Sequence, residues 1–246
     1  MHASRPSNYE MTEYIFLITF ISLISSWHFP CVHTDPVAIV QNHIKHVALT
    51  FDDGPYGTST QEILAILEQK KVPATFFLIG KNIEQYPQQV SEEVNNGFVV
   101  GNHSYSHSRF LSTMASSDLM EDIQKAQTLI EKNSGIIPHL FRPPYGSTSV
   151  SMVNEIKNEG YVIVRWTVDP EDWDNSNSSS SIVDSILRNV KENSIILLHD
   201  GHENTFTYDR ENTISALPTI IDDLRDEGYT FVTVDTILHT NSYIAK

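Results

Sequence analysis

Cysteine is almost absent from this chain. Among its 246 residues only Cys31 is a cysteine, so the chain can form no internal disulfide and no metal site built from several thiolates. Any metal ion would therefore have to be bound by histidine and carboxylate side chains. The sequence has many of these, with 11 histidines and 31 aspartates and glutamates.

Basic residues are also scarce. The 16 lysines and arginines leave a formal net charge of -15 at pH 7. A surplus of negative charge repels nucleic acids and anionic lipid surfaces at long range. We therefore expect no nucleic-acid partner, and a substrate or partner that is neutral or cationic.

Long hydrophobic runs are missing, with one shorter exception near the N-terminus. The apolar stretch from Tyr14 to Trp27 has the length of a signal-peptide core and is shorter than the roughly 20 residues that span a bilayer. It predicts that residues 1–40 are a signal segment or a short uncleaved membrane anchor. We accordingly expect a secreted or cell-surface protein, with membrane or cell-wall association through this segment.

The remainder, residues 41–246, is long enough for one domain with a full hydrophobic core. It contains neither an internal repeat nor a linker. Short apolar runs rich in β-branched and aromatic residues alternate with segments of helical period, which is typical of a parallel sheet covered by helices. We predict an α/β fold, a barrel of βα units rather than an open doubly wound sheet. The seven runs are HVALTF, ATFFLI, FVVG, HLFR, YVIVRWTV, SIILLH and TFVTV.

Helices are predicted between these runs. In residues 117–132, apolar side chains recur at spacings of three and four, as on one face of an amphipathic helix. Two further segments carry the capping-box pattern that starts a helix. The pairs are Ser59 with Glu62 and Ser181 with Asp184.

Residues with catalytic or metal-binding side chains follow five of the seven runs. Because the carboxyl ends of parallel strands meet at one edge of the sheet, these side chains should share one rim of the barrel. They are Asp52 and Asp53 after the first run, His103 and His107 after the third, Arg142 and Tyr145 after the fourth, Asp169, Asp172 and Trp173 after the fifth, and His199 and Asp200 after the sixth.

A divalent metal site is predicted at this rim. His103 and His107 are four residues apart, so on one helical turn both imidazoles would face the same way. Taken alone, such a pair is more often solvated or capping than metal-binding. With Asp53 from a neighbouring strand end, two histidines and a carboxylate would leave coordination positions open, as in a catalytic metal site.

The adjacent aspartates at the end of the first run suggest a division of labour. Neighbouring residues that leave a strand point in different directions, so Asp53 can bind the metal while Asp52 accepts a proton from a water molecule that the metal activates. The alternative is an ordinary turn, because Asp, Gly and Pro are common turn residues.

A proton donor and a charge partner complete the predicted site. His199 has a pKa suited to an acid, and a nearby Asp169 would favour its charged form and fix its orientation. Arg142, beside two rigid prolines, is explained as a partner for a carboxylate. The alternatives are a buried histidine that ends a strand, a surface cation at Arg142, and simple core positions for Trp173 and Leu197.

The ordered motifs TFDDGP, HSYSH, RPPYG, DPEDW and LLHD resemble the polysaccharide deacetylase family, the NodB-homology domain of carbohydrate esterase family four. The resemblance covers about residues 45–238. It implies a distorted (β/α)7 barrel in a single domain, 41–246, that removes acetyl groups from sugars with one bound divalent metal ion, most commonly zinc, with cobalt as an alternative.

The resemblance also implies roles for the residues that match the motifs. Asp52 is then the general base and His199 the general acid, with Asp169 tuning it and Arg142 orienting the catalytic aspartate. The metal ligands are Asp53, His103 and His107. The backbone N–H of Tyr145 would help stabilise the oxyanion, and Trp173 and Leu197 would line the pocket for the acetyl methyl group.

These patterns predict a monomeric hydrolase that deacetylates an N-acetylglucosamine polymer, namely chitin, chitooligosaccharide or peptidoglycan. Two alternatives stay open. A cell-wall polysaccharide-binding protein without turnover would keep the fold but has no physical need of both an acid and a base. An O-acetyl xylan esterase would use the same motifs, because attack by an activated water serves esters and amides alike.

Overall fold

The computed structural model describes residues 44–203 and 210–245. The predicted signal or anchor segment, residues 1–40, lies outside these residues. In the described part of the chain, seven strands form one parallel sheet. Their bounds are β1 Lys45–Gly54, β2 Ala74–Leu78, β3 Val99–Asn102, β4 Leu140–Phe141, β5 Val162–Ile163, β6 Ser194–His199 and β7 Tyr229–Phe231.

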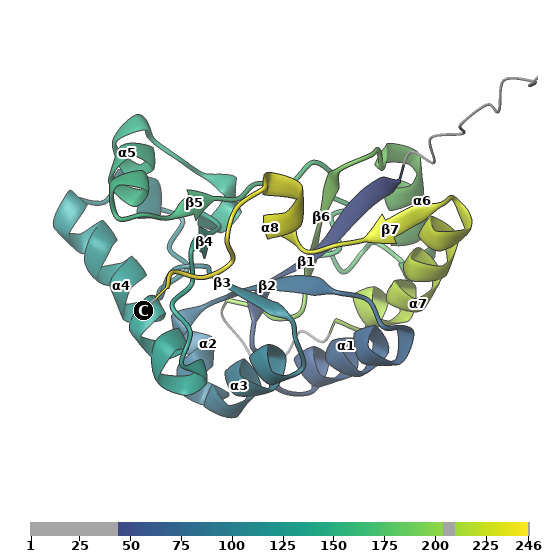
Figure 1. Cartoon of the computed structure of the whole chain (residues 1–246), viewed down its shortest axis with the longest axis horizontal. Coiled ribbons are helices and arrows are strands. Elements are labelled where there is room, and N and C mark those ends of the chain that lie inside the picture. The colour runs from purple at the N-terminus through teal and green to yellow at the C-terminus, as the bar shows by residue number, and fades with distance from the viewer. Residues whose placement is uncertain (1–43, 204–209, 246) are drawn as a thin grey trace, which may run out of the picture. The chain divides into compact units, whose positions relative to one another are not determined.

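The strands follow the order β5-β4-β3-β2-β1-β6, with β7 paired to the start of β1. Val47 pairs with both β6 and β7, so β7 lies on the same side of β1 as β2. Past the end of β5, Val168 forms a parallel bridge with Ile196 of β6, which brings the two ends of the strand order together. The predicted distorted barrel of parallel strands is confirmed, and Figure 1 shows the sheet curling with helices around it.

Each of the seven apolar runs overlaps a strand, but two of them extend well past the end of their strand. The run at residues 161–168 gives only the two-residue strand β5, because the chain then leaves β4 and reaches β6 through the Val168 bridge. The run at residues 230–234 ends as a strand at Phe231, and Val234 begins a short helix. Apolar content alone does not determine where a strand loses its hydrogen-bonded neighbour.

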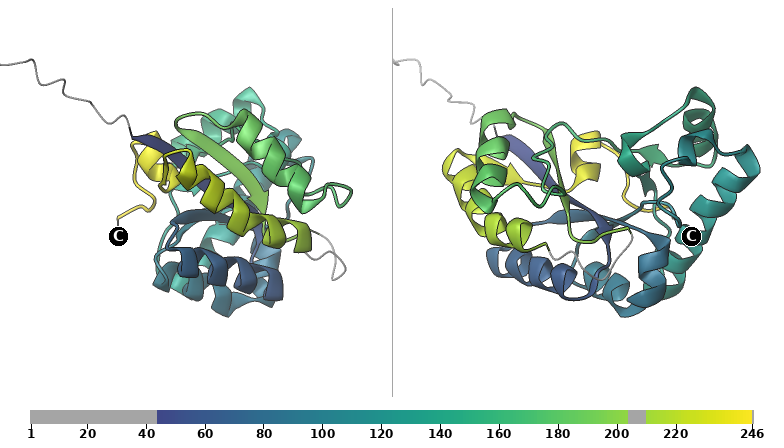
Figure 2. Two further views of the ribbon diagram at one scale, coloured as in Figure 1. Left: turned by 90° about the vertical axis from the view of Figure 1, so that its right-hand side faces the viewer. Right: turned by 180° about the vertical axis from the view of Figure 1, so that it is seen from behind.

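Helices pack around the sheet, as the two further views show (Figure 2). The predicted helix at residues 117–132 is α4, and its apolar stripe Leu119, Ile123, Ala126 and Ile130 is buried. The helices are α1 Gly57–Lys70, α2 Gly80–Gln85, α3 Pro87–Asn95, α4 Ser116–Ser134, α5 Val150–Asn158, α6 Ser179–Asn189, α7 Glu211–Asp226 and α8 Val234–Leu238, with 3-10 turns η1 Leu111–Thr113 and η2 Pro144–Gly146. No helix within the described ranges has the length and apolar character needed to cross a membrane.

Both predicted capping boxes are misplaced. Ser59 lies inside α1, which starts two residues earlier, and its side chain is buried. The start of α6 is capped by Ser178, whose side chain accepts a hydrogen bond from the backbone N–H of Ser181. In a run of consecutive serines the pattern cannot distinguish the first helical turn from the residue that caps it.

The pleat of the strands divides the core into two layers. Along β1, Val47, Leu49 and Phe51 pack toward the helices in the larger cluster. Ala48 belongs to a second cluster inside the barrel, together with Phe77 of β2, Ile195 of β6 and Val234 of α8. Because side chains alternate between the two faces, the positions after Ala48 on the inner face are Thr50 and then Asp52.

At Gly101 of β3 the barrel interior leaves no room for a side chain. A Cβ atom at this position would lie 2.6 Å from the Phe77 ring and 3.2 Å from the carbonyl oxygen of Leu140. We predict that Gly101→Ala destabilises the fold by about 1–3 kcal/mol, the usual effect of overpacking, as measured by urea unfolding. Phe77→Leu in the same chain should recover part of this loss, giving a non-additive double-mutant cycle. A Gly101→Ala variant as stable as the wild type would contradict the crowding.

Candidate active site

The site begins where β1 ends. The register of β1 with β2 shifts between Asp52 and Gly54, and the Asp53 backbone is left-handed, with φ 74°. Regular alternation would direct Asp53 away from Asp52, which was the expectation from the sequence. The irregular backbone instead brings both carboxylates to the same centre, because Asp52 Oδ2 and Asp53 Oδ1 lie 3.6 and 3.5 Å from the same atom, His103 Nε2.

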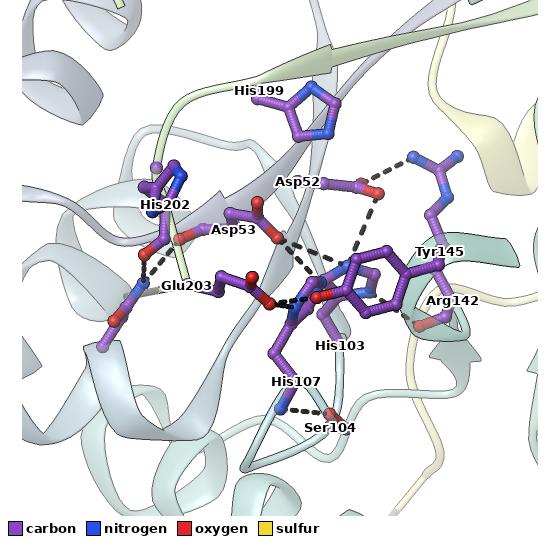
Figure 3. Close-up of polar contacts among 12 residues, drawn as sticks. Asp52, Asp53, His103, Ser104, His107, Arg142, Tyr145, His199, His202 and Glu203 are labelled. Carbon is purple, nitrogen blue, oxygen red and sulfur yellow. Dashed lines mark hydrogen bonds and ion pairs between the residues drawn. The ribbon is translucent and has the colours of Figure 1, made fainter. Parts of the chain in front are cut away.

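Three side chains converge beside Asp52. The Oδ1 of Asp53 lies 3.2 Å from Nε2 of His107, and one ligand atom from each of Asp53, His103 and His107 lies within 4.8 Å of the others. Figure 3 shows these side chains gathered together. Asp53 Oδ1 is buried without a hydrogen-bond partner among the described residues. A carboxylate oxygen that lacks a donor and faces two ring nitrogens fits a divalent cation held by two histidines and one carboxylate.

The two histidines are not on a helical turn, which corrects the prediction from their spacing. They lie in the loop after β3, where Ser104 and His107 both have left-handed backbones, with φ 68° and 51°. The Asn102 side chain accepts a hydrogen bond from Ser104 N–H, and Ser104 Oγ accepts one from His107 N–H. These bonds turn the loop so that both imidazoles face Asp53.

Each imidazole has a partner on the nitrogen that faces away from Asp53. His103 Nδ1 donates to the carbonyl oxygen of Arg142 at 2.7 Å, and His107 Nδ1 lies 2.6 Å from the carboxylate of Glu203. Burial and the neighbouring His107 lower the pKa of His103 to about 3, so its Nε2 lone pair is free at neutral pH. Burial lowers the pKa of His107, but Asp53 and Glu203 outweigh it and raise the pKa overall.

Asp52 is paired with a fully buried arginine. Arg142 Nη1 donates to Asp52 Oδ1 at 2.7 Å and to Thr50 Oγ1 at 2.8 Å, while its guanidinium lies 4.1 Å from the centroid of the Phe77 ring. Burial raises the pKa of the Asp52 carboxyl, although Arg142 and His199 partly oppose the rise. The sequence predicted a carboxylate partner for Arg142, and the structure places Asp52 there.

The carboxylate partner of His199 is Asp172, not the predicted Asp169. The Nδ1 of His199 lies 2.7 Å from Asp172 Oδ1, and its backbone N–H donates to Asp172 Oδ2 at 2.9 Å. Asp169 lies on the cavity wall and accepts a hydrogen bond from the backbone N–H of Glu171, which has φ 56°. The Asp169 side chain therefore stabilises a local turn, and this turn brings Asp172 to the His199 imidazole.

Comparison with known proteins identifies the family. A family model described as polysaccharide deacetylase matches residues 40–164. The chain belongs to the polysaccharide deacetylase family. The prediction that the chain resembles this family is confirmed, and so is the prediction that it is a polysaccharide deacetylase.

Similar proteins cover most of the chain. A peptidoglycan-N-acetylglucosamine deacetylase of Bacillus cereus is 38% identical over 201 residues, which are 81% of this chain and 91% of that protein. A chitooligosaccharide deacetylase of Sinorhizobium fredii is 37% identical over 190 residues, covering 74% and 87%. The crystal structure of the Bc1960 peptidoglycan N-acetylglucosamine deacetylase superposes with a TM-score of 0.76 at 34% identity, covering 81% of this chain and 91% of that one.

In this polysaccharide deacetylase, a cavity of about 410 Å³ joins the two aspartates, His103, His107 and His199. Leu197 and Trp173, which the family resemblance assigns to the pocket for the acetyl methyl group, also line this cavity, but they differ in exposure. Leu197 is buried on the inner face of β6, whereas Trp173 is 52% exposed at the rim. Tyr145 is also on the wall and has a left-handed backbone with φ 57°.

Three residues of the deacetylase site were not assigned by the motifs. Glu203 contacts His107, Asp172 contacts His199, and the buried Arg210 donates two hydrogen bonds to the carbonyl oxygen of Gly201, at 2.8 and 2.5 Å. Asp172 was visible in DPEDW, and Glu203 is one of the polar residues directly after the sixth run. Arg210 lies outside all five motifs, so nothing in the sequence pattern pointed to it.

Titration of the His199 imidazole tests whether Asp172 is its carboxylate partner. Burial lowers the pKa of His199, but the Asp172 charge outweighs it and raises the pKa to about 9. In Asp172→Asn that charge is lost while burial persists, so the pKa of His199 should fall by more than about one unit, equivalent to about 1.4 kcal/mol. NMR titration of the imidazole measures the change.

The matched control is Asp169→Asn, which removes the neighbouring carboxylate on the same loop. It should leave the His199 titration within a few tenths of a unit. If Asp169→Asn lowers the pKa of His199 and Asp172→Asn does not, the assignment of the partner is wrong.

Proposed function

We propose that the chain is a metal-dependent deacetylase that hydrolyses the N-acetyl groups of a polysaccharide containing N-acetylglucosamine. The observation that carries the proposal is that Asp53, His103 and His107 converge beside Asp52, in one cavity with His199. Metal ligands, a proton acceptor and a proton donor would then surround one substrate position.

The metal would be held by Asp53, His103 and His107. Their carboxylate and imidazole atoms suit zinc, and also cobalt; zinc is our choice. When bound, such an ion supplies a Lewis acid that polarises the acetyl carbonyl and lowers the pKa of a water molecule. The low pKa of His103 favours binding, because its ring does not have to lose a proton at neutral pH.

Asp52 accepts the proton of the attacking water. Burial makes it a better proton acceptor than an exposed aspartate,. The bond from Arg142 to Oδ1 fixes the carboxylate and leaves Oδ2 directed toward the metal ligands. Because Arg142 is itself buried and bonded to Thr50, the carboxylate is held before substrate arrives.

His199 supplies a proton to the leaving amine. With its pKa raised to about 9 by Asp172, the imidazole carries that proton at neutral pH and can deliver it as the carbon–nitrogen bond breaks. The Tyr145 backbone N–H would donate to the oxyanion. Leu197 and Trp173 would offer apolar surface for the acetyl methyl group, a role supported by their place in the wall of the cavity.

The substrate class follows from the relatives and from charge. The similar proteins are named for peptidoglycan N-acetylglucosamine and for chitooligosaccharide, and both substrates contain N-acetylated aminosugars. A neutral polymer such as chitooligosaccharide is not repelled by a net charge of -15,. We also propose export or surface anchoring through residues 1–40, because such polymers lie outside the cell; detection of the tagged chain in culture medium or membrane fractions tests this.

A substrate panel tests the function. Purified protein loaded with Zn²⁺ or Co²⁺ should release acetate from chitooligosaccharide or from peptidoglycan, and removal of metal by a chelator should abolish release until the ion is returned. Acetylated xylan is included so that ester cleavage can be recognised. No acetate from any N-acetylated glycan, with metal bound and the protein folded, would contradict the proposal.

The proton acceptor is tested by Asp52→Asn. We expect kcat to fall by about 10²- to 10⁴-fold, the usual contribution of a general base, while the variant still binds one metal ion because Asp53 and both histidines remain. Asp222→Asn, which breaks only the surface ion pair with Lys70, is the control and should keep full activity. Circular dichroism checks folding, and a folded Asp52→Asn variant with wild-type kcat would overturn the assignment.

A further inference from the structure

Glu203 lies beside the metal site but is absent from the motifs that predict it. It follows β6 by four residues, whereas His107 follows β3 and Tyr145 follows β4. Its Oε2 atom lies 2.6 Å from His107 Nδ1 and accepts a hydrogen bond from the Tyr145 hydroxyl. One carboxylate therefore connects loops from three strand ends, as Figure 3 shows.

The position of Glu203 determines which nitrogen of His107 can bind a metal. A neutral imidazole carries its hydrogen on one nitrogen and its lone pair on the other. Glu203 faces Nδ1, so that nitrogen holds the hydrogen and donates it, and the lone pair is left on Nε2. The Nε2 atom is the one that lies 3.2 Å from Asp53 Oδ1.

The same arrangement occurs at His103 with a different acceptor. There Nδ1 donates to the backbone carbonyl of Arg142 at 2.7 Å, and Nε2 faces Asp53. A backbone carbonyl is present whatever the side chain, so His103 keeps its orientation in any sequence with this loop. His107 depends on the side chain of one residue, Glu203.

Glu203 is held in place from its other side. The Tyr145 ring packs against the His107 imidazole, with ring centroids 4.8 Å apart. The Tyr145 hydroxyl and the His107 ring therefore reach the Glu203 carboxylate side by side. The Glu203 side chain is 22% exposed. Both the His107 ring and the Tyr145 hydroxyl meet the same carboxylate oxygen, Oε2, which holds it from two sides.

We propose that Glu203 is a positioning residue for the metal site. It fixes the tautomer and ring orientation of His107 and adds a negative charge behind this ligand, and so strengthens binding of the divalent ion. The inference rests on the proposed metal-dependent function. Glu203 is not itself a ligand, because its carboxylate meets the His107 nitrogen that faces away from Asp53.

Metal affinity measures this role directly. Protein stripped with a chelator is titrated with Zn²⁺ or Co²⁺ in a calorimeter, for the wild type, Glu203→Ala and Glu203→Gln. Glu203→Ala should bind about 10- to 100-fold more weakly, the usual effect of removing a ligand's hydrogen-bond partner. Glu203→Gln should lose less, because its amide oxygen still accepts from Nδ1. The visible absorption of the Co²⁺ protein should change in Glu203→Ala and return toward the wild type in Glu203→Gln.

Glu84→Ala is the matched control. Glu84 also accepts a hydrogen bond from a tyrosine hydroxyl, that of Tyr105 at 3.1 Å, but it has no histidine ligand beside it. Its removal should leave metal affinity and the Co²⁺ spectrum unchanged. Thermal unfolding monitors the folding of every variant.

The outcomes separate this inference from the proposed function. If the wild type binds Zn²⁺ and folded Glu203→Ala binds it within twofold as tightly, Glu203 is only a contact between loops and the inference is wrong. If Glu203→Gln loses as much affinity as Glu203→Ala, its charge rather than its acceptor atom is responsible, and the tautomer argument fails. If the wild type binds neither ion, the proposed function itself fails.

Discussion

Two adjacent carboxylates are buried at the end of β1, and the rest of the site depends on compensating their charge. Like charges removed from water cannot both stay ionised without nearby cations or donors. Asp52 receives a guanidinium, since Arg142 lies within the barrel and donates to it at 2.7 Å. Among residues 44–203 and 210–245, Asp53 Oδ1 has no hydrogen-bond donor, and it lies 3.5 and 3.2 Å from the Nε2 atoms of His103 and His107. The two aspartates therefore differ in their surroundings: Asp52 is paired with a guanidinium, whereas Asp53 is the carboxylate whose position fits a bound cation.

The parallel sheet makes this compensation feasible. Each strand delivers its last side chains to the same edge, so Arg142 from β4 and His103 from β3 reach Asp52 and Asp53 over short distances. Strand β6 meets β1 through the backbone as well, since the backbone N–H of Asp200 donates to the Asp52 carbonyl at 3.1 Å. Only glycine can follow there, because a Cβ at Gly201 would lie 2.0 Å from the Asp53 carbonyl oxygen. Backbone geometry thus brings His199, at the end of β6, next to Asp52 on β1.

The sequence predicted the strands and the residues at their ends better than the contacts among them. Apolar runs located all seven strands because burial on both faces of a parallel sheet leaves a continuous pattern. The contacts depend on loops, where one left-handed residue redirects a side chain. Glu171 has that conformation, which is why Asp172 rather than Asp169 reaches His199; both aspartates follow the same run, and spacing does not separate them. Glu203 could not be assigned for the same reason, since its contacts come from loops far apart in the sequence.

Burial by itself does not determine what an aspartate does in this site. Asp52 and Asp172 are both buried, yet the pKa of Asp52 is raised and that of Asp172 is lowered. Burial raises the pKa at both positions. At Asp172 it is outweighed by His199, which is bonded through its ring and its backbone N–H, and by the Thr213 hydroxyl at 2.7 Å. With Arg142 as its one charged hydrogen-bond donor, Asp52 remains able to take up a proton, whereas Asp172 stays ionised and holds the proton on His199. The hydrogen-bond donors around each carboxylate therefore set the direction of its pKa shift, and this difference supports the proposed roles of Asp52 as the base and of Asp172 as the partner of the acid.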